Sequence, residues 1–354
     1  MTDNAQRNRE AEVDLLAAAR EAQWSAAAFM GPNTMKLVSP AKVNLLLAIG
    51  ERRPDGYHDA DTIMHALALH DTLYLRCEDV SADELAKRMA EGASRVDVAV
   101  GGPSDNLHMT IDLSDRTGQD LAVPAGDNLA FKAADRLARA VGRDLPEAIQ
   151  LRIEKHIPAQ AGLGGGSSNA AAVLVGLAKA WGVAADDERV VEVARSLGAD
   201  VAFFLQGGCA LLDGVGEVLQ RTLAPSNRAV VLVKPETGVS TAAAYQRFDE
   251  SPTPVPADVL QRDLAAATAA DVVLANNLAP AAEALLPELA EVRAWLAEHA
   301  GAENVLLSGS GSATFALVDT FADASAIATA ATAQGWWARP TNLSGLRATL
   351  VPGR

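Results

Sequence analysis

An eleven-residue stretch from Pro158 to Ser168, with the sequence PAQAGLGGGSS, constrains the fold of this chain more than any other feature. It stands between the apolar run Leu151–Ile153, which predicts a short strand, and an Ala-rich segment from Asn169 to about Trp181, which predicts a helix. Glycines permit positive φ angles and a close approach of ligand to backbone, and the N–H groups at the start of a helix attract anions. The position of this loop therefore predicts a phosphate-binding site built from the backbone.

Three other interpretations of the loop fit less well. A flexible linker does not usually stand between a predicted strand and an apolar helix. A Walker A loop requires Lys after its last glycine, whereas Ser167 follows Gly166 here. A dinucleotide fingerprint needs a different glycine spacing and a later acidic residue. An ATP-binding loop of another kind remains, with Ser167 and Ser168 offering hydroxyls to phosphate or to phosphate-bound Mg²⁺. The nucleotide-binding candidates are Pro158, Ala159, Gln160, Ala161, Gly162, Leu163, Gly164, Gly165, Gly166, Ser167 and Ser168.

A second segment, Ser39–Asn44, lies near the start of the predicted strand Lys36–Ile49. Lys42 and Asn44 are two residues apart, so their side chains share one face of that strand. A lysine before an apolar run can also be an edge charge whose ammonium reaches solvent. Taken alone the lysine favours that simpler interpretation, and the nearby glycine loop makes a functional role worth considering.

A third segment, Gly198–Phe204, carries Asp200 within an otherwise apolar run. A lone Asp at such a boundary is often the N-cap of a helix, and that interpretation stays open. A buried Lys42 would be an alternative partner, because a neighbouring cation keeps a carboxylate ionised and oriented.

Composition limits the partners that this chain can have. Of its 354 residues, 30 are basic and 45 acidic, which gives a net charge of −15 and disfavours nucleic acid. Hydrophobic residues at 49% and charged residues at 21% predict a folded globular protein. The two cysteines, Cys77 and Cys209, are expected to be reduced and structural. No secretory leader and no run of eighteen apolar residues is recognisable, so we expect no membrane contact and a cytoplasmic location.

The length favours two domains. We expect an N-terminal extension at 1–34 with loosely helical spacing, a first domain at 35–225 and a second at 226–354, divided at the loop Ala224–Asn227. In the first domain we expect an antiparallel pair of strands at 36–49 and 63–75 joined by a turn at 53–56, then short strands and variable loops over 78–126, including Gly101–Pro103. A helix at 129–141, capped by Asp127 or Asn128, and a helix ending near 198 follow. In the second domain we expect strands at 228–234, 304–307 and 313–318 and a helix at 278–299.

The segments Ser39–Asn44, Pro158–Ser168 and Leu307–Ser312 together resemble the three motifs of the GHMP kinases, a family of small-molecule kinases, in order and in spacing. The resemblance covers roughly residues 36 to 320. It implies an α+β fold with an N-terminal ATP-binding α/β domain and a C-terminal ferredoxin-like α/β domain, the active site lying between them. It also implies that the third motif buttresses the nucleotide loop.

Two further runs, Arg53–His58 and Gly214–Glu217, look like the branch of this family whose substrate is a cytidine diphosphate sugar alcohol. They look less like the mevalonate, galactose or homoserine kinases. The resemblance implies that Tyr57 stacks on the cytosine, that His58 hydrogen-bonds its polar edge and that Asn44 helps to hold the substrate, which suits a planar base with polar edges. Without the surrounding motifs, Tyr57 and His58 would be interpreted as an exposed pair of side chains in a loop.

Other contacts follow from the resemblance as well. Tyr245 is the candidate for an aromatic ring that the second domain places over the base, and Lys155 and Asn128 fall where the family has contacts on the adenine side. The chain departs from its relatives in a longer N-terminus, a longer segment between Cys77 and Asp127, and Ala159–Ala161 in place of part of a glycine run. These departures affect loop shape and nucleotide affinity.

The implied reaction is transfer of the γ-phosphoryl group of ATP to the 2-hydroxyl of the methylerythritol unit, in non-mevalonate isoprenoid synthesis. Asp200 would orient the hydroxyl and take its proton late, while Lys42 would stabilise the attacking oxygen. Mg²⁺ is expected on the ATP phosphates, with Ser167 or Asp200 as the candidate residues to hold it, in a monomer or homodimer. The rivals are another GHMP kinase, such as a homoserine or mevalonate kinase, and a non-catalytic nucleotide-binding relative, which would be expected to have lost Lys42 or Asp200.

Overall fold

The computed structural model describes residues 31, 33–92, 106–117 and 128–352. Three of the sequence expectations therefore fall outside the described residues. They are the helical spacing within residues 1–30, the loop at Gly101–Pro103 and the role of Asp127 as a helix cap.

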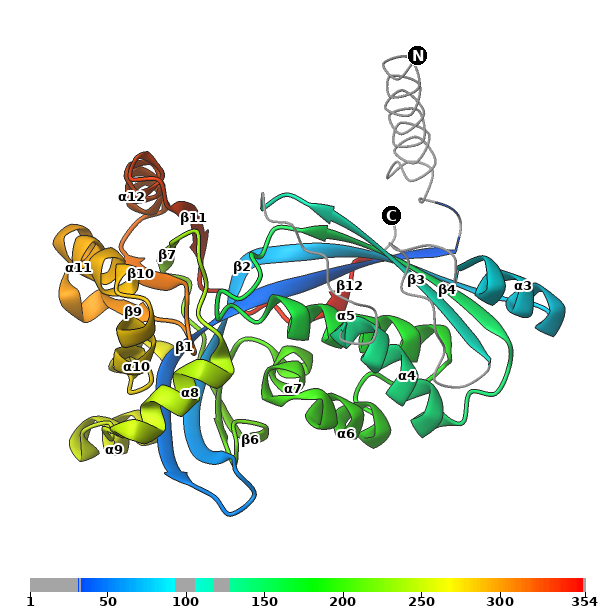
Figure 1. Cartoon of the computed structure of the whole chain (residues 1–354), viewed down its shortest axis with the longest axis horizontal. Helices are drawn as coiled ribbons and strands as arrows, with labels where there is room; N and C mark the ends of the chain where they lie inside the picture. Colours follow the sequence, from blue (N-terminus) through cyan, green and yellow to red (C-terminus); the bar gives the residue numbers. More distant parts are fainter. Residues whose placement is uncertain (1–30, 32, 93–105, 118–127, 353–354) are drawn as a thin grey trace, which may run out of the picture.

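Two long strands form the centre of the first sheet. β1 (Thr34–Arg52) and β2 (His58–Asp79) pair antiparallel along most of their length, which confirms the expected strand pair. The turn between them closes where Gly56, at φ +90°, donates its N–H to Arg53 O over 3.0 Å. Figure 1 shows both strands running from the region formed by the N-terminal half of the chain into the region formed by the C-terminal half. They therefore carry residues of the first motif to the junction of the two parts.

The remaining strands extend this sheet in the order β12-β1-β2-β4-β3. β4 (Glu147–Lys155) pairs antiparallel with β2, and β3 (Leu107–Asp115) runs parallel to β4. Four shorter strands complete it: β5 (Cys209–Asp213), β6 (Val218–Leu223), β8 (Ala275–Asn276) and β12 (Thr349–Leu350). The last two come from the second half of the sequence, so the C-terminal segment is built into the first sheet.

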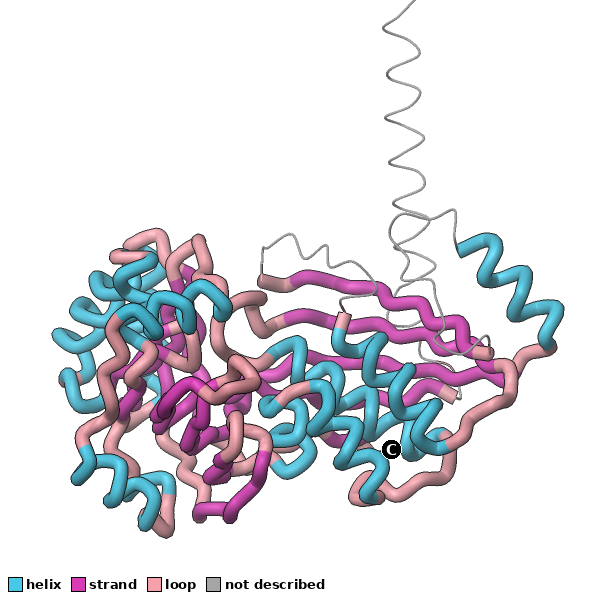
Figure 2. Tube along the Cα trace, turned by 60° about the horizontal axis from the view of Figure 1, so that its bottom comes forward, coloured by secondary structure: helices cyan, strands magenta, loops and turns pink. Residues whose placement is uncertain are grey.

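Four helices gather on one side of this sheet, as Figures 1 and 2 show. They are α4 (Leu129–Val141), α5 (Gly165–Ala180), α6 (Glu188–Leu197) and α7 (Ala199–Gln206). α5 is apolar around most of its circumference and is buried between the sheet and the other helices, as a central core helix must be. The expected cap is confirmed at Asn128, whose Oδ1 accepts from Ala130 N over 2.9 Å.

The second sheet has four antiparallel strands in the order β11-β7-β10-β9. They are β7 (Ala229–Lys234), β9 (Val305–Leu307), β10 (Thr314–Val318) and β11 (Trp337–Asn342). α11 (Glu288–Ala300) and α12 (Phe321–Ala333) cover one face with a core of their own. The other face, with Val230 and Phe315, joins a cluster that includes Val43 of β1 and Leu163 of the glycine loop. This shared core fixes the glycine loop relative to both sheets.

The second half also contains α8 (Thr241–Glu250), α9 (Ala257–Ala265), α10 (Ala279–Leu285) and the short 3₁₀ turns η2 (Ala269–Asp271) and η3 (Ala302–Asn304). We propose that the boundary between residues 225 and 226 falls in the loop between β6 and β7, although β8 and β12 cross back into the first sheet. Cys77 and Cys209 are both free thiols.

Outside the glycine loop, two expectations about secondary structure were wrong in part or in whole. Short strands were expected over 78–126, and β3 confirms one of them, but the start of this segment holds a helix, α3 (Ala82–Gly92). Its first turn carries Asp83 and Glu84, and Ser81 Oγ accepts from Glu84 N over 3.2 Å, which is a typical helix start. The helix expected over 278–299 is two helices, α10 and α11, because the chain breaks at Leu286–Pro287.

Candidate active site

The glycine loop connects β4 directly to α5, as expected. The helix begins at Gly165, four residues before the expected start at Asn169, so Gly165–Ser168 form its first turn. Gly164 precedes the helix in the left-handed conformation, at φ +71°. The free N–H groups of this sixteen-residue helix therefore lie within the loop itself, where they and the helix dipole favour an anion.

Two glycines of the loop are required by close contacts. A Cβ on Gly162, which has φ +73°, would lie 2.1 Å from the carbonyl oxygen of Ser308. A Cβ on Gly164 would lie 2.8 Å from the ring of Phe204 and 3.1 Å from Lys42 Cγ. Neither position has room for a side chain, so the backbone of the loop sits directly against the third motif and against Lys42.

The third motif supports the glycine loop through hydrogen bonds. Ser308 Oγ donates to Gly162 O over 3.0 Å and Ser312 Oγ donates to Gln160 O over 2.9 Å. The backbone N–H of Ala313 donates to Ala161 O over 3.0 Å. The contact that the family resemblance implied between these two motifs is present.

A cavity of about 350 Å³ opens along the glycine loop. Its lining combines the loop with residues of β3, β4, α4 and α5: Leu113, Asn128, Leu129, Ile153, Lys155, Pro158, Ala159, Gln160, Ala161, Gly162, Leu163, Gly164, Gly165, Gly166, Ser167 and Asn169. All the nucleotide-binding candidates except Ser168 are therefore brought together. Ser168 is fully buried, and its hydroxyl accepts from Ser39 Oγ over 2.8 Å beneath the loop.

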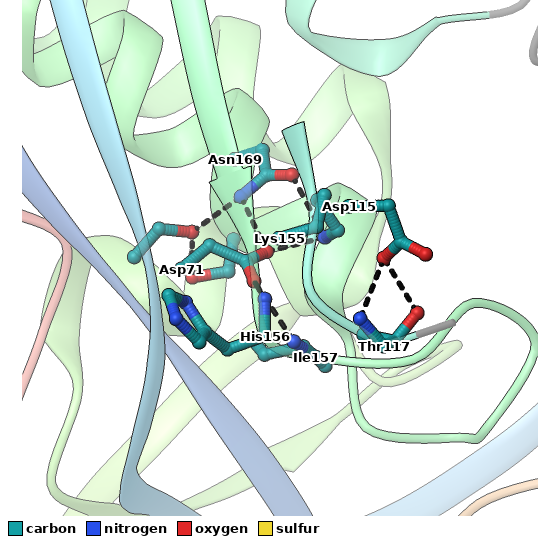
Figure 3. Close-up of polar contacts among 9 residues, drawn as sticks. Asp71, Asp115, Thr117, Lys155, His156, Ile157 and Asn169 are labelled. Atoms are coloured by element: carbon teal, nitrogen blue, oxygen red, sulfur yellow. Dashed lines mark hydrogen bonds and ion pairs between the residues drawn. The ribbon is translucent and has the colours of Figure 1, made fainter. Parts of the chain in front are cut away.

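Lys155 lines this cavity, but its ammonium is paired with the buried carboxylate of Asp71 (Figure 3). It also donates to Asn169 Oδ1 over 3.1 Å. Asp71 Oδ1 accepts from the backbone N–H of His156 over 2.7 Å and of Ile157 over 2.9 Å. Asp71 thus holds together the end of β4 and the lysine that borders the cavity along the glycine loop.

Asn169 extends this buried network to the first turn of α5. Its Nδ2 donates to Asp71 Oδ2 over 2.9 Å and to Ser39 Oγ over 2.8 Å. At the rim of the same region, Asp115 Oδ1 accepts from the N–H and the hydroxyl of Thr117 (Figure 3). Sequence reasoning missed Asp71, and the available signal was an acidic residue within the apolar run Ile63–Leu75.

A second cavity, of about 470 Å³, lies against Gln160 and Gly162 of the glycine loop. Its lining comes from both halves of the chain: Lys42, Asn44, Leu47, Ala60, Thr62, Met64, Gln160, Gly162, Ala199, Asp200, Val215, Gly216, Val239, Ser240, Thr241, Tyr245, Gly309, Ser310 and Gly311. Among the described residues, Gln160 and Gly162 line both cavities. The two cavities therefore meet at the glycine loop.

Lys42 and Asp200 form an ion pair within this second cavity. Lys42 Nζ lies 3.5 Å from Asp200 Oδ2, with the lysine side chain 4% exposed and the aspartate 30% exposed. Asp200 is in the first turn of α7, whose N-cap is Gly198, so the N-cap interpretation of Asp200 was wrong. The carboxylate is free to face the cavity.

Asn44 lies on the same face of β1 as Lys42, as the two-residue spacing predicted. Its Oδ1 accepts from Lys42 Nζ over 2.7 Å, and its Nδ2 donates to Thr62 Oγ1 over 2.8 Å. Thr62 in turn donates to Leu46 O over 2.7 Å. This chain of hydrogen bonds orients the ammonium of Lys42 toward Asp200, and Thr62 is a member that the sequence did not reveal.

Tyr245 borders the second cavity from α8. Burial, together with the nearby negative charge of Asp200, raises the pKa of Tyr245 to about 12. The phenol therefore stays neutral, and it can offer a hydrogen bond as well as an apolar ring face.

The structure brings His58, but not Tyr57, close to this cavity. His58 is buried, its Nε2 lies 2.6 Å from Asp249 Oδ1, and its ring centroid is 5.5 Å from that of Tyr245. Tyr57 is 64% exposed on the β1–β2 turn and is not among the residues that line either cavity. Asp249, the partner of His58, is a further residue that sequence reasoning missed.

Comparison with known proteins places this geometry in a family. The descriptions "GHMP kinases N terminal domain" and "GHMP kinases C terminal" match residues 128–208 and 258–335. A homoserine kinase structure from Cytophaga hutchinsonii, at 18% identity, has the same fold with a TM-score of 0.63 and covers 91% of this chain and 98% of its own. The chain belongs to the GHMP kinases.

More similar relatives narrow the family further. The 4-diphosphocytidyl-2-C-methyl-D-erythritol kinase of Desulfitobacterium hafniense (strain Y51) is 36% identical over 301 residues, or 84% of this chain and 91% of its own. That of Pelotomaculum thermopropionicum is 37% identical over 281 residues, covering 78% and 86%. A crystal structure of 4-(cytidine 5'-diphospho)-2C-methyl-D-erythritol kinase has 33% identity and a TM-score of 0.64, and it covers 88% of this chain and 100% of its own. Within the GHMP kinases, the chain belongs to the 4-diphosphocytidyl-2-C-methyl-D-erythritol kinase family.

Proposed function

We propose that this chain transfers the γ-phosphoryl group of ATP to the 2-hydroxyl of 4-diphosphocytidyl-2-C-methyl-D-erythritol, giving the 2-phosphate and ADP in the non-mevalonate route to isopentenyl diphosphate. The observation that carries the proposal is the Lys42–Asp200 ion pair, which faces a cavity that meets the glycine-loop cavity at Gln160 and Gly162. A phosphoryl donor in one cavity and an alcohol in the other would then react across the loop.

In this reaction the acceptor oxygen forms a bond to the γ-phosphorus while the bond between that phosphorus and the β–γ bridging oxygen breaks. The bridging oxygen leaves with the electron pair as part of ADP. Asp200 accepts a hydrogen bond from the 2-hydroxyl and receives its proton late in a loose transition state, because a ground-state alcohol is far too weak an acid to give it up. Lys42, held by Asn44, stabilises the negative charge on the attacking oxygen.

ATP is proposed to lie in the first cavity with its phosphates on the backbone N–H groups of the glycine loop and the first turn of α5. Lys155 and Asn128 border the same cavity and are the proposed contacts on the adenine side. Both are already engaged, Lys155 by Asp71 and Asn128 by the α4 cap, so their side chains are rigid before the nucleotide arrives.

The donor set is compatible with Mg²⁺ carried mainly by the nucleotide. In the described part of the chain, no three His, Cys, Asp or Glu residues cluster as a metal site, which suits an ion that keeps waters and phosphate oxygens as ligands. Ser167 and Asp200, one in each cavity lining, are the residues proposed to hold it. The ion would supply positive charge to the phosphates.

The cytidine group is proposed to lie on the His58 side of the second cavity. His58 packs against Tyr245, and its Nε2 is taken by Asp249, which leaves Nδ1 for a polar edge of the base. Tyr245 would present its ring, and Asn44 would help to hold the sugar alcohol. Tyr57 is proposed to fold from its exposed position onto the cytosine when substrate binds.

Location and assembly complete the proposal. Among the described residues, no helix has both the length and the apolar character needed to cross a membrane. We propose a cytoplasmic enzyme, monomeric or homodimeric, whose partner is its small-molecule substrate and which, at a net charge of −15, has no nucleic-acid partner.

The test is ADP release with Mg·ATP and four separate acceptors: 4-diphosphocytidyl-2-C-methyl-D-erythritol, methylerythritol phosphate, homoserine and mevalonate. We expect turnover only with the cytidyl acceptor. Turnover with a different acceptor would keep the Lys42–Asp200 chemistry but replace the substrate. No turnover with any of the four would favour a non-catalytic nucleotide-binding role.

A further inference from the structure

Gln160 has an unusual backbone conformation for its residue type. Its φ is +50°, and it is the one residue other than glycine that has a positive φ in the part of the chain that the structure describes. A glutamine in this conformation is strained, since its Cβ crowds the backbone, and glycine would avoid that strain. Such an outlier beside a ligand cavity points to a role for the side chain, because a loop that needed only the backbone geometry would be better served by glycine.

The side chain of Gln160 stands where the two cavities meet. Gln160 and Gly162 are shared by both linings among the described residues, and glycine has no side chain, so Gln160 is the shared residue that can offer a side chain to a ligand. The residue is exposed, in contrast to the buried Ala161 and Leu163 that follow it. A ligand that spans the two cavities would therefore pass beside Gln160.

Gln160 is anchored through its backbone on one side and lies against Gly238 on the other. Its backbone carbonyl accepts from Ser312 Oγ over 2.9 Å, which anchors the residue to the third motif. On the opposite side lies Gly238, where a Cβ would come within 3.3 Å of Gln160 Cβ and of Gln160 Oε1. Gln160 thus fits between the glycine loop and the segment that leads into α8.

The hydrogen bond that the described residues make with Gln160 in the third motif goes to its backbone carbonyl, so the exposed carboxamide keeps two donor hydrogens and an acceptor oxygen for a ligand. A Cβ on Gly238 would lie 3.3 Å from Gln160 Oε1, so the carboxamide oxygen lies on the Gly238 side of the residue, and we infer that Nε2 is the atom that donates to a ligand. A neutral donor at this point suits an oxygen that carries negative charge, because hydrogen bonds to charged groups are stronger than those between neutral groups.

We propose that the Gln160 carboxamide contacts the reacting phosphoryl group, donating a hydrogen bond from Nε2 to a non-bridging oxygen of the γ-phosphate as that group moves from the nucleotide to the acceptor hydroxyl. Gln160 gives up no proton and forms no covalent bond in this step. The inference rests on the proposed kinase function and adds a catalytic contact to the backbone amides of the loop. On this proposal, the strained backbone conformation of Gln160 serves to place its carboxamide at the reacting phosphoryl group.

The alternative is that Gln160 acts only as a spacer between the glycine loop and Gly238. Three substitutions separate the two roles. Gln160→Met keeps the length of the side chain but removes the donor, Gln160→Glu keeps the shape but adds a negative charge, and Gln160→Gly removes both the side chain and the backbone strain. Gln334→Met, at the exposed C-terminal end of α12, is a matched control.

The first measurement is steady-state turnover with Mg·ATP and the cytidyl acceptor. We expect Gln160→Met to lower kcat by roughly ten- to a hundredfold, with less than a twofold change in KM for the acceptor. Gln160→Glu should lower kcat further and raise KM for ATP, because its carboxylate repels the phosphates. Gln160→Gly should lose activity like Gln160→Met but show an equal or higher Tm. A spacer role predicts instead that Gln160→Met, which preserves the shape, retains wild-type kcat.

The second measurement does not need the acceptor, so it tests Gln160 even if the proposed substrate is wrong. Dissociation constants are measured for ADP and for the non-hydrolysable ATP analogue AMP-PNP with the wild type and each variant. We expect Gln160→Met to weaken AMP-PNP about fivefold or more while leaving ADP and the Gln334→Met control unchanged. An unchanged ratio of the two constants would overturn the proposal, whereas failure of turnover in the wild type with an altered ratio would count only against the proposed substrate.

Discussion

The ammonium of Lys42 lies 3.5 Å from the carboxylate of Asp200, across 158 residues of sequence and at the wall of the cavity proposed for the acceptor. Lys42 comes from β1 and Asp200 from the first turn of α7. Gly164 packs against both elements, because a Cβ added to it would lie 3.1 Å from Lys42 Cγ and 2.8 Å from the ring of Phe204 in α7. The nucleotide loop and the ion pair are therefore parts of one packed unit.

This arrangement predicts that two substitutions lower turnover without a matching loss of nucleotide affinity. Asp200→Ala and Lys42→Ala should each lower kcat by orders of magnitude, because both residues line the cavity proposed for the acceptor and are proposed to act on the attacking oxygen. ADP binding should largely persist, since neither residue lines the nucleotide cavity. Turnover is measured by ADP release and binding by calorimetry. Near-normal turnover in either variant would remove that residue from the mechanism.

A pair of glycine substitutions should separate backbone strain from steric clash. Gly162 and Gly182 have nearly the same φ, +73° and +70°, but a Cβ on Gly162 would meet Ser308 O at 2.1 Å while one on Gly182 would meet nothing within 4 Å. Gly182→Ala should lower the free energy of unfolding by about 1–2 kcal/mol. Gly162→Ala should lower it by a further ~1–3 kcal/mol, since the loop must shift.

Urea denaturation of both variants, without nucleotide, measures these losses. The same loss in the two variants would mean that the third motif moves aside without resistance, and that the hydrogen bonds from Ser308 and Ser312 do not fix the loop.

The buried pair Asp71–Lys155 should be strongly coupled. Asp71→Asn leaves a nearly buried ammonium without its counter-ion and is expected to lower the free energy of unfolding by about 3–5 kcal/mol. The double variant Asp71→Asn/Lys155→Met should lose less than the sum of its two single variants, because it no longer buries an unpaired charge. Chemical denaturation of the four proteins in this cycle gives the coupling, and simple additivity would contradict it.

Much of this site could be predicted from local patterns, and the rest could not, for identifiable reasons. The shared face of Lys42 and Asn44 follows from the two-residue period of a strand, and the position of the glycine loop follows from its neighbours. The start of α5 at Gly165 was missed, because glycine has a low helix propensity and tertiary packing overrode it. Asp71 was missed because its partner lies 84 residues away on another strand.

The residues around Tyr245 and His58 show the same limit of prediction from local sequence patterns. Tyr245 was predicted from the family resemblance, which implies an aromatic ring of the second domain over the base, and it does line the cavity proposed for the acceptor. Asp249, which holds His58, gave no signal, since an acid near the end of an exposed helix is common. The positive φ of Gln160 depends on contacts with Ser312 and Gly238, which come from segments that sequence spacing alone cannot bring together.

Tyr57 offers a test of the base-stacking proposal, because it is 64% exposed and contributes little to folding. Tyr57→Ala should weaken binding of the cytidyl acceptor by about 1–3 kcal/mol. KM for ATP should stay the same, and the free energy of unfolding should change by no more than about 0.5 kcal/mol. Tyr57→Phe, which keeps the ring, is the control. Unchanged acceptor affinity in Tyr57→Ala would assign the stacking role to Tyr245 alone.

His65 predicts a pH dependence of stability that is independent of catalysis. It is fully buried in β2, where its Nδ1 lies 2.8 Å from Ala66 O and its Nε2 accepts from the N–H of Ser226 over 2.9 Å. Burial lowers the pKa of His65 from 6.5 to about 4. The unfolded chain therefore binds a proton more readily than the folded one, and the stability that His65 contributes above pH 6.5 is lost as the pH falls toward 4.

The size of the effect follows from the difference between the two pKa values, and it amounts to a loss on the order of 3 kcal/mol across that range. Urea denaturation between pH 7.5 and 4.5 should therefore give a steeper fall in stability for the wild type than for His65→Asn, even if the variant is less stable throughout. His156→Gln, at an exposed ring, should keep the wild-type slope. Equal slopes for the wild type and His65→Asn would mean that the loop carrying Ser226 opens enough to hydrate a protonated His65 in the folded state.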